Sequence, residues 1–421
     1  MAAEQEHEHE GVQDLVGAEG EEDAEFVNQE DIEIIYTDDE DMPMDEDEGE
    51  GEDAEEEEEE ELPEPTENTS VARFPSHGKS VFAVSIHPTQ PLAASGGEDD
   101  LGYVWDLRTG EVITKLSGHE DSVVAVEWSA DGEMVATGGM DGKVRIWRRV
   151  GKEKWTMWEF LNELQGPDEV MWLKWHPRGP VLLAGSNDST VWLWQLPSGN
   201  TMQVFAGHEG PVHTGNFTPD GKRIVTADQA GTLIAWDPRG ATPLFKLTPS
   251  AHFPYESGIT SLSVNPACTL AVVGGAEGAV RVVNLNKGEV LGGVEGHREG
   301  ESVEAIEFVE LVGAGVGAGG VVVTGATDGK ACIWDVGTMR LRVTLEHDDA
   351  VTSLHSHASA PHLITSASAD RTLKTWDART GQLIKEHKGH RGMINAADVS
   401  RDGKYAVSAG DEGVCLVWDL Q

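Results

Sequence analysis

The residues of this chain that could do chemistry recur as a set of four types: a His, a hydroxyl residue, an Asp and a Trp, always in this order. Ser, His and Asp together are the parts of a catalytic triad, in which the His takes the proton of an attacking hydroxyl. The last three types also keep one constant spacing. Four sets are complete: His77/Ser95/Asp99/Trp105, His119/Thr137/Asp141/Trp147, His297/Thr324/Asp328/Trp334 and His347/Ser366/Asp370/Trp376.

The recurrence itself argues against catalysis, because an enzyme needs one such site and this chain repeats it. We expect a buried hydrogen-bond chain instead, in which the Asp holds the His, the His holds the hydroxyl and the hydroxyl meets the indole N–H. Two copies depart from the pattern. Ala230 stands where the fourth copy should have its Asp, and the fifth copy has Glu277 and Val283 in place of Asp and Trp. We expect these two copies to lack the network and to be held mainly by apolar packing.

Three other motifs resemble chemical sites. Residues 315–320 fit G-x-G-x-x-G, but a strand and a turn follow them where a dinucleotide fold needs a helix. Residues 78–80 imitate the end of a phosphate-binding loop, with Arg73 in the place of its first Gly. Residues 6–10 alternate Glu and His without a closed ligand set. The sequence therefore predicts no catalytic residue, no cofactor and no metal site.

The elements that carry these residues are short strands. In residues 118–147 the runs VVAVEW, MVATGG and KVRIW are separated by Asp131-Gly132 and Asp141-Gly142, which are strong hairpin signals. Strands this short need neighbours to bury both faces. The pattern recurs roughly every 40 to 50 residues, the period of a WD-repeat propeller blade. Its copies end at Trp105, Trp147, Trp194, Trp236, Val283, Trp334, Trp376 and Trp418. The sequence predicts an all-β fold, an eight-bladed WD-repeat β-propeller.

The ends of the chain indicate how the ring closes. The last copy stops at Gln421, directly after its Trp strand, and so lacks an outer strand. Residues 70–74, before the first His, are the unassigned run that reads as a strand. We expect them to complete the eighth blade, since closure removes exposed sheet edges. The predicted domains are an acidic tail at 1–68 and a propeller at 69–421.

The net charge of −46 is concentrated at the start of the chain, where residues 1–68 hold 33 of the 76 acids and no Lys or Arg. This tail is low in apolar residues, so we expect it to be disordered. Phe26 and residues 32–36 form an apolar island within it, either a short docking motif or a solvated fluctuation. The acidic surface should repel nucleic acid and anionic membranes and attract basic partners.

The three Cys residues lie in different copies without a C-x-x-C motif: Cys268, Cys332 and Cys415. This pattern is typical of a reducing compartment. No apolar run reaches the ~18 residues of a membrane span, and the acidic start differs from a signal peptide. We expect a soluble, cytoplasmic monomer that binds neither membrane nor nucleic acid directly.

One face of the predicted propeller is rich in acids. The loop with the opening His and the turn with the Asp emerge on the same side, which we call the top face. Acids near these positions are either a solvated surface or a site that captures a Lys/Arg-rich segment by charge complementarity, and we advance the second hypothesis. The candidates are Glu98, Asp100, Glu120, Asp121, Asp168, Glu169, Glu209, Glu256, Glu299, Glu301, Glu304, Asp348 and Asp349.

Tryptophans crowd the third copy. Trp175 and Trp194 align with core positions of the second copy, whereas Trp172 and Trp192 align with Ala125 and Arg145. Trp is favoured at interface hot spots. Trp172 and Trp192 are therefore either a partner-binding aromatic patch or locally packed side chains.

Two stretches carry a family resemblance: SGGEDDLGYVWDLRTGE at 95–111 and MWLKWHPRGPVLLAGSNDSTVWLW at 171–194. Together with the acidic tail and the eight repeats, they resemble the angio-associated migratory cell protein family. The fungal branch of that family is similar to a dedicated chaperone, whose acidic top face holds the basic N-terminal segment of a newly made large-subunit ribosomal protein. The resemblance implies client contacts for Glu120, Asp121, Asp168, Glu169, Glu301, Asp348 and Asp349. Animal members are linked to migration and signalling.

We therefore expect a non-enzymatic chaperone for a basic segment of a large-subunit ribosomal protein, acting in ribosome assembly. The alternative is a general interaction scaffold in signalling or cell migration, with a histone-binding chaperone as a third possibility. Binding of a basic segment should weaken steeply with salt, and a hydrophobic scaffold contact should not.

Overall fold

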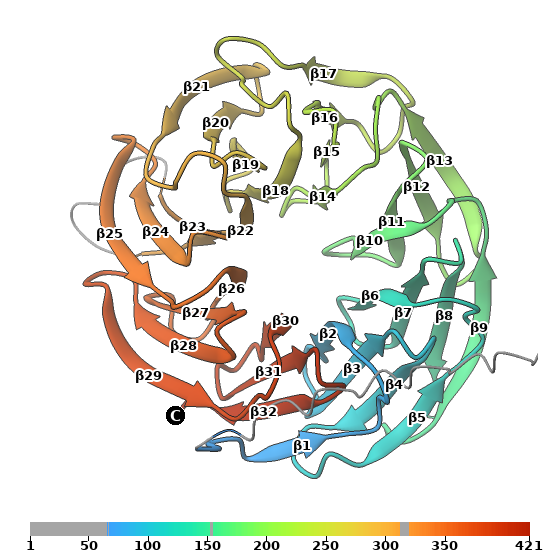
Figure 1. Ribbon diagram of the computed structural model, residues 1–421. Coiled ribbons are helices and arrows are strands. Elements are labelled where there is room, and N and C mark those ends of the chain that lie inside the picture. Colours follow the sequence, from blue (N-terminus) through green and yellow to red (C-terminus); the bar gives the residue numbers. More distant parts are fainter. Residues whose placement is uncertain (1–64, 66, 152–154, 312–319) are drawn as a thin grey trace, which may run out of the picture. The chain divides into compact units, whose positions relative to one another are not determined.

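The computed structural model describes residues 65, 67–151, 155–311 and 320–421. Over these ranges every regular element is a strand, and the strands form eight four-stranded antiparallel sheets set as blades around a ring (Figure 1). The prediction of an all-β, eight-bladed propeller is confirmed. The predicted tail up to residue 64, with its Glu-His run and apolar island, and residues 315–319 of the Gly-rich motif lie outside the described residues.

The first four blades each consist of four consecutive strands, with the innermost strand first. Blade one has β2 (Val81–Ile86), β3 (Leu92–Gly97), β4 (Gly102–Asp106) and β5 (Val112–Leu116). Blade two has β6 (Val123–Trp128), β7 (Met134–Gly139), β8 (Val144–Arg149) and β9 (Trp158–Leu164). Blade three has β10 (Val170–Trp175), β11 (Val181–Ser186), β12 (Thr190–Gln195) and β13 (Asn200–Ala206). Blade four has β14 (Thr214–Phe217), β15 (Ile224–Ala227), β16 (Leu233–Trp236) and β17 (Pro243–Leu247).

Blades five to seven follow the same order, and blade eight ends the chain with three strands. Blade five has β18 (Ile259–Val264), β19 (Leu270–Gly275), β20 (Val280–Asn284) and β21 (Glu289–Val294). Blade six has β22 (Val303–Val309), β23 (Val321–Ala326), β24 (Lys330–Asp335) and β25 (Arg340–Glu346). Blade seven has β26 (Val351–Ser356), β27 (Leu363–Ser368), β28 (Thr372–Asp377) and β29 (Gln382–Lys388). Blade eight has β30 (Ile394–Val399), β31 (Tyr405–Gly410) and β32 (Cys415–Asp419).

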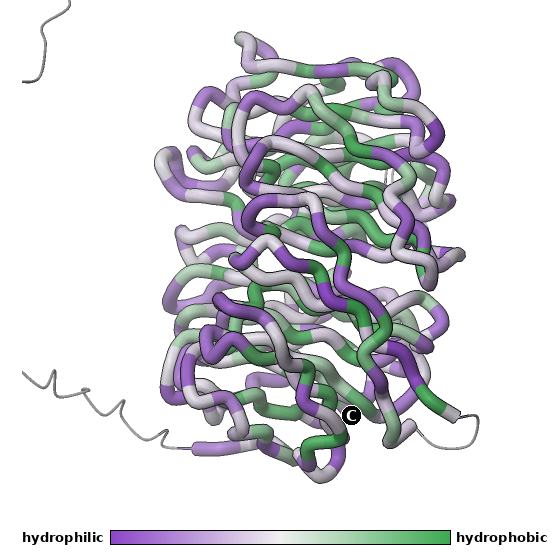
Figure 2. Tube along the Cα trace, turned by 90° about the vertical axis from the view of Figure 1, so that its right-hand side faces the viewer, coloured by the Kyte–Doolittle hydropathy of each residue, from purple (hydrophilic) through white to green (hydrophobic). Residues whose placement is uncertain are grey.

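The core lies between neighbouring blades. The middle strands read as β-branched and other apolar runs, such as Val321–Ala326, which is buried at every position. One apolar cluster joins Ile146 of blade two to Leu182 of blade three, and the other blade pairs are joined in the same way. In the edge-on view of Figure 2, hydrophobic stretches run through the strands and hydrophilic ones gather in the loops. Because both faces of each sheet are covered, the loops on the two faces of the ring carry most of the charge.

The first described strand closes the ring. β1 (Ala72–Phe74) pairs antiparallel with β32, with Phe74 opposite Cys415, and so supplies the outer strand of blade eight. The Phe74 ring is fully buried and stacks on Trp105 of blade one, with centroids 4.7 Å apart. Burying a side chain of this size stabilises the fold by about 1.5–3 kcal/mol. Residues from the predicted strand 70–74 thus tie the last blade to the first.

The inner strands share one irregularity near their start. In seven blades the register shifts after the first residue of the inner strand, for example between Val81 and Ala83 of β2 and between Val303 and Ala305 of β22. A bulge of this kind re-aims the extra side chain. It affects Phe82, Val124, Met171, Thr260, Glu304, Thr352 and Asn395.

Candidate functional site

The recurring His sets are buried hydrogen-bond chains. In blade one, His77 Nδ1 lies 2.9 Å from an Asp99 carboxylate oxygen and Nε2 lies 2.8 Å from Ser95 Oγ. The Trp105 indole N–H donates to the same Ser95 Oγ at 3.2 Å. If Nδ1–H donates to Asp99, Nε2 accepts the Ser95 O–H. The hydroxyl is then bonded on both sides and shut inside the blade, where it cannot attack a substrate.

Blade six repeats this arrangement in full. His297 Nδ1 lies 3.2 Å from an Asp328 carboxylate oxygen, and Nε2 lies 2.7 Å from Thr324 Oγ1. The Thr324 hydroxyl also accepts the Trp334 indole N–H at 2.8 Å. Thr324 is fully buried, and the side chains of His297 and Asp328 are shielded from solvent. Thr324 and Asp328 therefore hold the blade together and offer no surface to a partner.

Blade seven has the same complete chain. His347 Nδ1 lies 2.8 Å from Asp370, and Nε2 lies 2.7 Å from Ser366 Oγ, which accepts the Trp376 indole N–H at 2.8 Å. Ser366 is fully buried, so its hydroxyl is as inaccessible as that of Ser95. The prediction of a structural network is thus met in blades one, six and seven.

Blade two keeps the first part of the chain and departs at its end. His119 bridges Asp141 and Thr137 at 3.0 and 2.8 Å. The Trp147 indole packs edge-on against Phe160, with centroids 5.9 Å apart, and among the described residues its N–H makes no bond to Thr137. The expected indole contact is therefore wrong for this blade. Burial lowers the pKa of the His119 imidazole, which keeps the ring neutral.

The expectation that blade four lacks this network was wrong. His208 lies 2.8 Å from Asp228 and 2.7 Å from Thr226, whose hydroxyl accepts the Trp236 N–H at 2.8 Å. The carboxylate comes from Asp228, two residues before Ala230, and this carboxylate also accepts the Thr232 amide at 2.6 Å. Although burial raises the pKa of Asp228, the bonds from His208 and Thr232 outweigh it and lower the pKa overall.

Three other blades secure the same loop with different residues. In blade eight, Glu412 replaces the Asp and lies 2.6 Å from His390 Nδ1. In blade five, the buried Tyr255 donates its O–H to the Val273 carbonyl at 2.7 Å. In blade three, which lacks the His, the Trp192 ring lies over Gly166, where an added Cβ would come within 2.3 Å of it. Sequence alignment missed Glu412 and Tyr255 because neither has the expected residue type.

The top face is built from loops that the backbone ties together. In every blade a turn between the second and third strands donates an amide to the loop before the inner strand. Examples are Met140 to Ser122 at 2.9 Å, Asn187 to Glu169 at 3.0 Å and Ala369 to Ala350 at 2.8 Å. These two segments of each blade therefore lie on one side of the ring, as expected from the sequence.

The predicted acids in these loops divide into paired and unpaired groups. Glu120 is 79% exposed and lies 2.9 Å from Lys143, and Glu209 is 69% exposed and lies 2.9 Å from Lys246. Glu98 and Glu301 also face a base, Lys79 at 3.5 Å and Arg298 at 3.4 Å. Exposed pairs of this kind contribute about 0–1 kcal/mol, so an incoming base can displace the resident one.

Three of the remaining predicted acids are exposed without a resident base: Glu256, Glu299 and Glu304. Within the described ranges, no Lys or Arg side chain lies at ion-pair distance from Glu256, Glu299 or Glu304. Glu304 is the bulged second residue of β22, which places it beside the central channel. Asp188, in the turn of blade three, is a further exposed acid of this face, which its place in the β11–β12 turn could have revealed. Of the other candidates, the half-buried ones are Asp100 and Glu169, and the exposed ones are Asp121, Asp168, Asp348 and Asp349.

The two unusual tryptophans of blade three differ in setting. Trp172 lies on β10, donates its N–H to the Val212 carbonyl at 2.8 Å and packs against Gly185 and Gly215. Trp192 stacks on Trp194 with centroids 5.9 Å apart. Both indoles are partly exposed. Each ring therefore has a packing role and still presents surface to solvent.

Neither a metal site nor a membrane-spanning helix is found in residues 65, 67–151, 155–311 and 320–421. These ranges contain no cluster of three or more His, Cys, Asp or Glu able to hold a metal ion. They also contain no helix long and apolar enough to cross a membrane.

The WD domain, G-beta repeat family matches six segments: 68–106, 110–148, 158–195, 199–237, 339–377 and 381–419. Angio-associated migratory cell protein of Homo sapiens is 31% identical over 366 residues, covering 84% of this chain and 80% of the relative. The ribosome assembly protein SQT1 of Saccharomyces cerevisiae is 27% identical, covering 84% and 87%. A solved structure of Chaetomium thermophilum Sqt1 bound to the N-terminus of the ribosomal protein L10 is 28% identical, with a TM-score of 0.78 over 84% of this chain and 100% of that one.

Proposed function

This chain belongs to the angio-associated migratory cell protein family of WD-repeat propellers, and we propose that it is a dedicated, non-enzymatic chaperone of ribosome assembly. Its client is a newly made large-subunit ribosomal protein of the L10 type. The top face holds the basic N-terminal segment of that client during or soon after synthesis. Covering the segment prevents aggregation and premature contacts with RNA.

Two observations together support this proposal most strongly. The top face presents exposed acids around most of the ring, and a solved relative with the same fold is bound to the N-terminus of ribosomal protein L10. Basic segments of ribosomal proteins are rich in Lys and Arg, which this face attracts by charge complementarity. The face has no comparable use for nucleic acid, whose phosphates it repels.

The proposal assigns client contacts to the predicted acids of the top face. Glu120, Asp121, Asp348 and Asp349 stand out because they lie in exposed loops of two blades on different parts of the ring. Trp172 and Trp192 add aromatic surface on which an Arg side chain can stack. The chaperone acts in the cytoplasm, where the client is made, and as a monomer.

The test is direct binding of a fluorescent peptide with the sequence of the N-terminal segment of the organism's own L10-type protein, to the full chain. The double variant Glu120→Lys/Asp348→Lys should bind at least about tenfold more weakly, which is about 1.4 kcal/mol. The matched control is Glu111→Lys/Glu310→Lys, which changes the net charge equally at exposed sites away from the top face. Equal affinities of the two double variants would overturn the assignment of the face.

Salt separates this proposal from a hydrophobic scaffold. Between about 0.01 and 1 M salt the Debye length falls from about 30 to 3 Å. Affinity for the peptide should fall steeply over this range. A partner whose affinity is unchanged by salt would point to the scaffold function instead.

A further inference from the structure

A ring of polar residues lines the central channel at one level. The ring position is defined by strand pairing. In blade one, Ser85 pairs with Ala94 of the second strand, and Ala94 pairs with Val104, the residue before Trp105. Each other blade has one inner-strand residue at the equivalent position. This inner-strand position is polar in every blade, although its neighbours along the strand are mostly apolar. The ring consists of Ser85, Glu127, Lys174, Asn216, Ser263, Glu307, His355 and Asp398.

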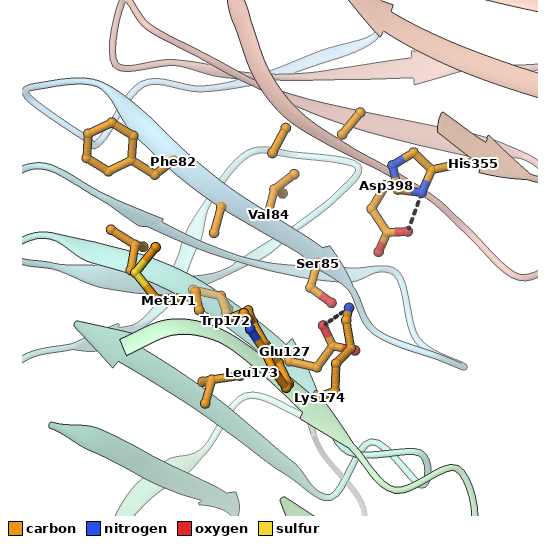
Figure 3. Close-up of a pocket in the computed structure, with 16 residues that line it drawn as sticks. Phe82, Val84, Ser85, Glu127, Met171, Trp172, Leu173, Lys174, His355 and Asp398 are labelled. Atoms are coloured by element: carbon orange, nitrogen blue, oxygen red, sulfur yellow. Dashed lines mark hydrogen bonds and ion pairs between the residues drawn. The ribbon is translucent and has the colours of Figure 1, made fainter. Parts of the chain in front are cut away.

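A cavity of about 370 Å³ leads to this ring. In Figure 3 the side chains of Phe82, Met171 and Leu173 lie toward one side of it, and the charged residues lie toward the other as two pairs, Glu127 with Lys174 and Asp398 with His355. Phe82 and Met171 are the bulged second residues of their inner strands, the same position that Glu304 occupies in blade six. This end of each inner strand is the one next to the top face. The ring lies three residues further along the strands, about 10 Å at 3.3 Å per residue. The lining of the cavity thus extends from the bulged residues Phe82 and Met171, near the top-face ends of their strands, past apolar side chains to the charged residues of the ring.

Acids outnumber bases at the charged end. The Lys174 ammonium lies 3.4 Å from a Glu127 carboxylate oxygen. Asp398 accepts the backbone N–H groups of Ile86 and Val399, both at 2.7 Å, and Glu307 accepts the Ser356 hydroxyl at 2.6 Å. In this described ring, three carboxylates therefore face a single Lys.

The neighbouring His does not supply the missing positive charge. His355 Nδ1 lies 3.9 Å from Asp398, and its Nε2 is buried with no hydrogen-bond partner in the described structure. Burial lowers the pKa of His355 to about 4, so the ring is neutral. Burial also raises the pKa of Asp398 to about 6 and raises that of Glu307. Asp398 has backbone N–H donors but no cationic partner within the described residues, and its side chain is 28% exposed, so a cation entering the cavity can reach it.

We propose that the channel is the anchor site for one Arg or Lys side chain of the bound segment. The side chain enters at the mouth, lays its aliphatic stem along Phe82, Val84 and Met171, and brings its cation to Asp398. Long basic side chains bury apolar stems in this way while their charged heads find polar partners. Because the ring lies below the face, the backbone of the segment has to dip into the mouth. This inference rests on the proposed function and names its most deeply bound residue.

The test uses the full chain, the same N-terminal peptide, and peptides in which each Arg or Lys is replaced in turn by Gln. Asp398→Asn should weaken the parent peptide by about tenfold or more. The peptide whose Gln replaces the anchoring Arg or Lys should no longer contact Asp398. It should therefore bind the Asp398→Asn variant and the unchanged protein with equal affinity. Asn216→Asp, which adds a carboxylate to the ring with the same shape, should tighten the parent peptide severalfold, a gain that misfolding cannot mimic.

The outcomes distinguish this inference from the proposed function. Suppose that the parent peptide binds, that Glu120→Lys/Asp348→Lys weakens its binding, and that the ring variants leave its affinity unchanged. The channel is then not an anchor site, and only this inference fails. The inference fails in the same way if Asp398→Asn weakens every Gln peptide equally. If the parent peptide does not bind the unchanged protein at all, the proposed function fails first.

Discussion

The Asp228→Ala variant tests how blade four is held. Asp228 is fully buried and accepts three donors: His208 Nδ1 at 2.8 Å, the Thr232 amide at 2.6 Å and the Glu209 amide at 3.1 Å. The first two donors are buried, and each loses a bond to a charged acceptor worth about 1.5–3 kcal/mol. We therefore expect the free energy of unfolding to fall by about 3–6 kcal/mol.

The assay is equilibrium denaturant unfolding of the full chain, together with hydrogen exchange at the Thr232 amide, which should accelerate about 100-fold or more if it loses its acceptor. The control is Ala230→Asp, which adds the carboxylate where the repeat pattern places it. At this half-buried turn position it should change stability by no more than about 0.5 kcal/mol. If Ala230→Asp restored the stability of Asp228→Ala, position 230 could serve the network and our reasoning would be refuted.

Three further predictions concern the fold and the face. Burial lowers the pKa of His387 to about 4 from 6.5, so the unfolded state binds more protons between these values and stability is lost as pH falls from 6.5 toward 4. His387→Phe should remove about 2 kcal/mol of that loss at about pH 5, measured by unfolding at about pH 5 and 7.5; an unchanged pH dependence would contradict it. Phe74→Ala should cost about 3–5 kcal/mol by opening the ring closure, and the exposed Val71→Ala almost nothing. Trp192→Ala should weaken peptide binding about tenfold if the indole contacts the client, and retained affinity would leave it a packing residue.

The repeat pattern was sufficient for the fold, because blade architecture depends on strand periodicity and turn residues that each copy carries locally. Residues 70–74 could be placed for the same reason: a missing outer strand and a spare strand-like run leave one solution. The stacking of Phe74 on Trp105 could not be read, since it depends on how blade eight, to which β1 belongs, packs against blade one.

The site was less predictable, because its chemistry depends on geometry that tolerates different residues. Asp228 reaches His208 from two positions before the expected one, and Glu412 reaches its His with one more methylene. A strict alignment of types therefore missed both. The channel ring could have been found by aligning the inner strands, where Glu127, Glu307 and Asp398 share one position. Its unbalanced charge becomes visible only when the strands meet around the channel.

The central claim is that the top face chaperones a basic segment of a ribosomal protein. The most direct measurement is the soluble fraction of the full-length L10-type client, co-expressed with this chain or with its Glu120→Lys/Asp121→Lys/Asp348→Lys/Asp349→Lys variant, and repeated with a client that lacks its N-terminal segment. Our account predicts that the intact client stays soluble only with the unchanged chain, and that the truncated client gains nothing from either. Equal solubility with the charge-reversed variant, or equal rescue of the truncated client, would contradict it.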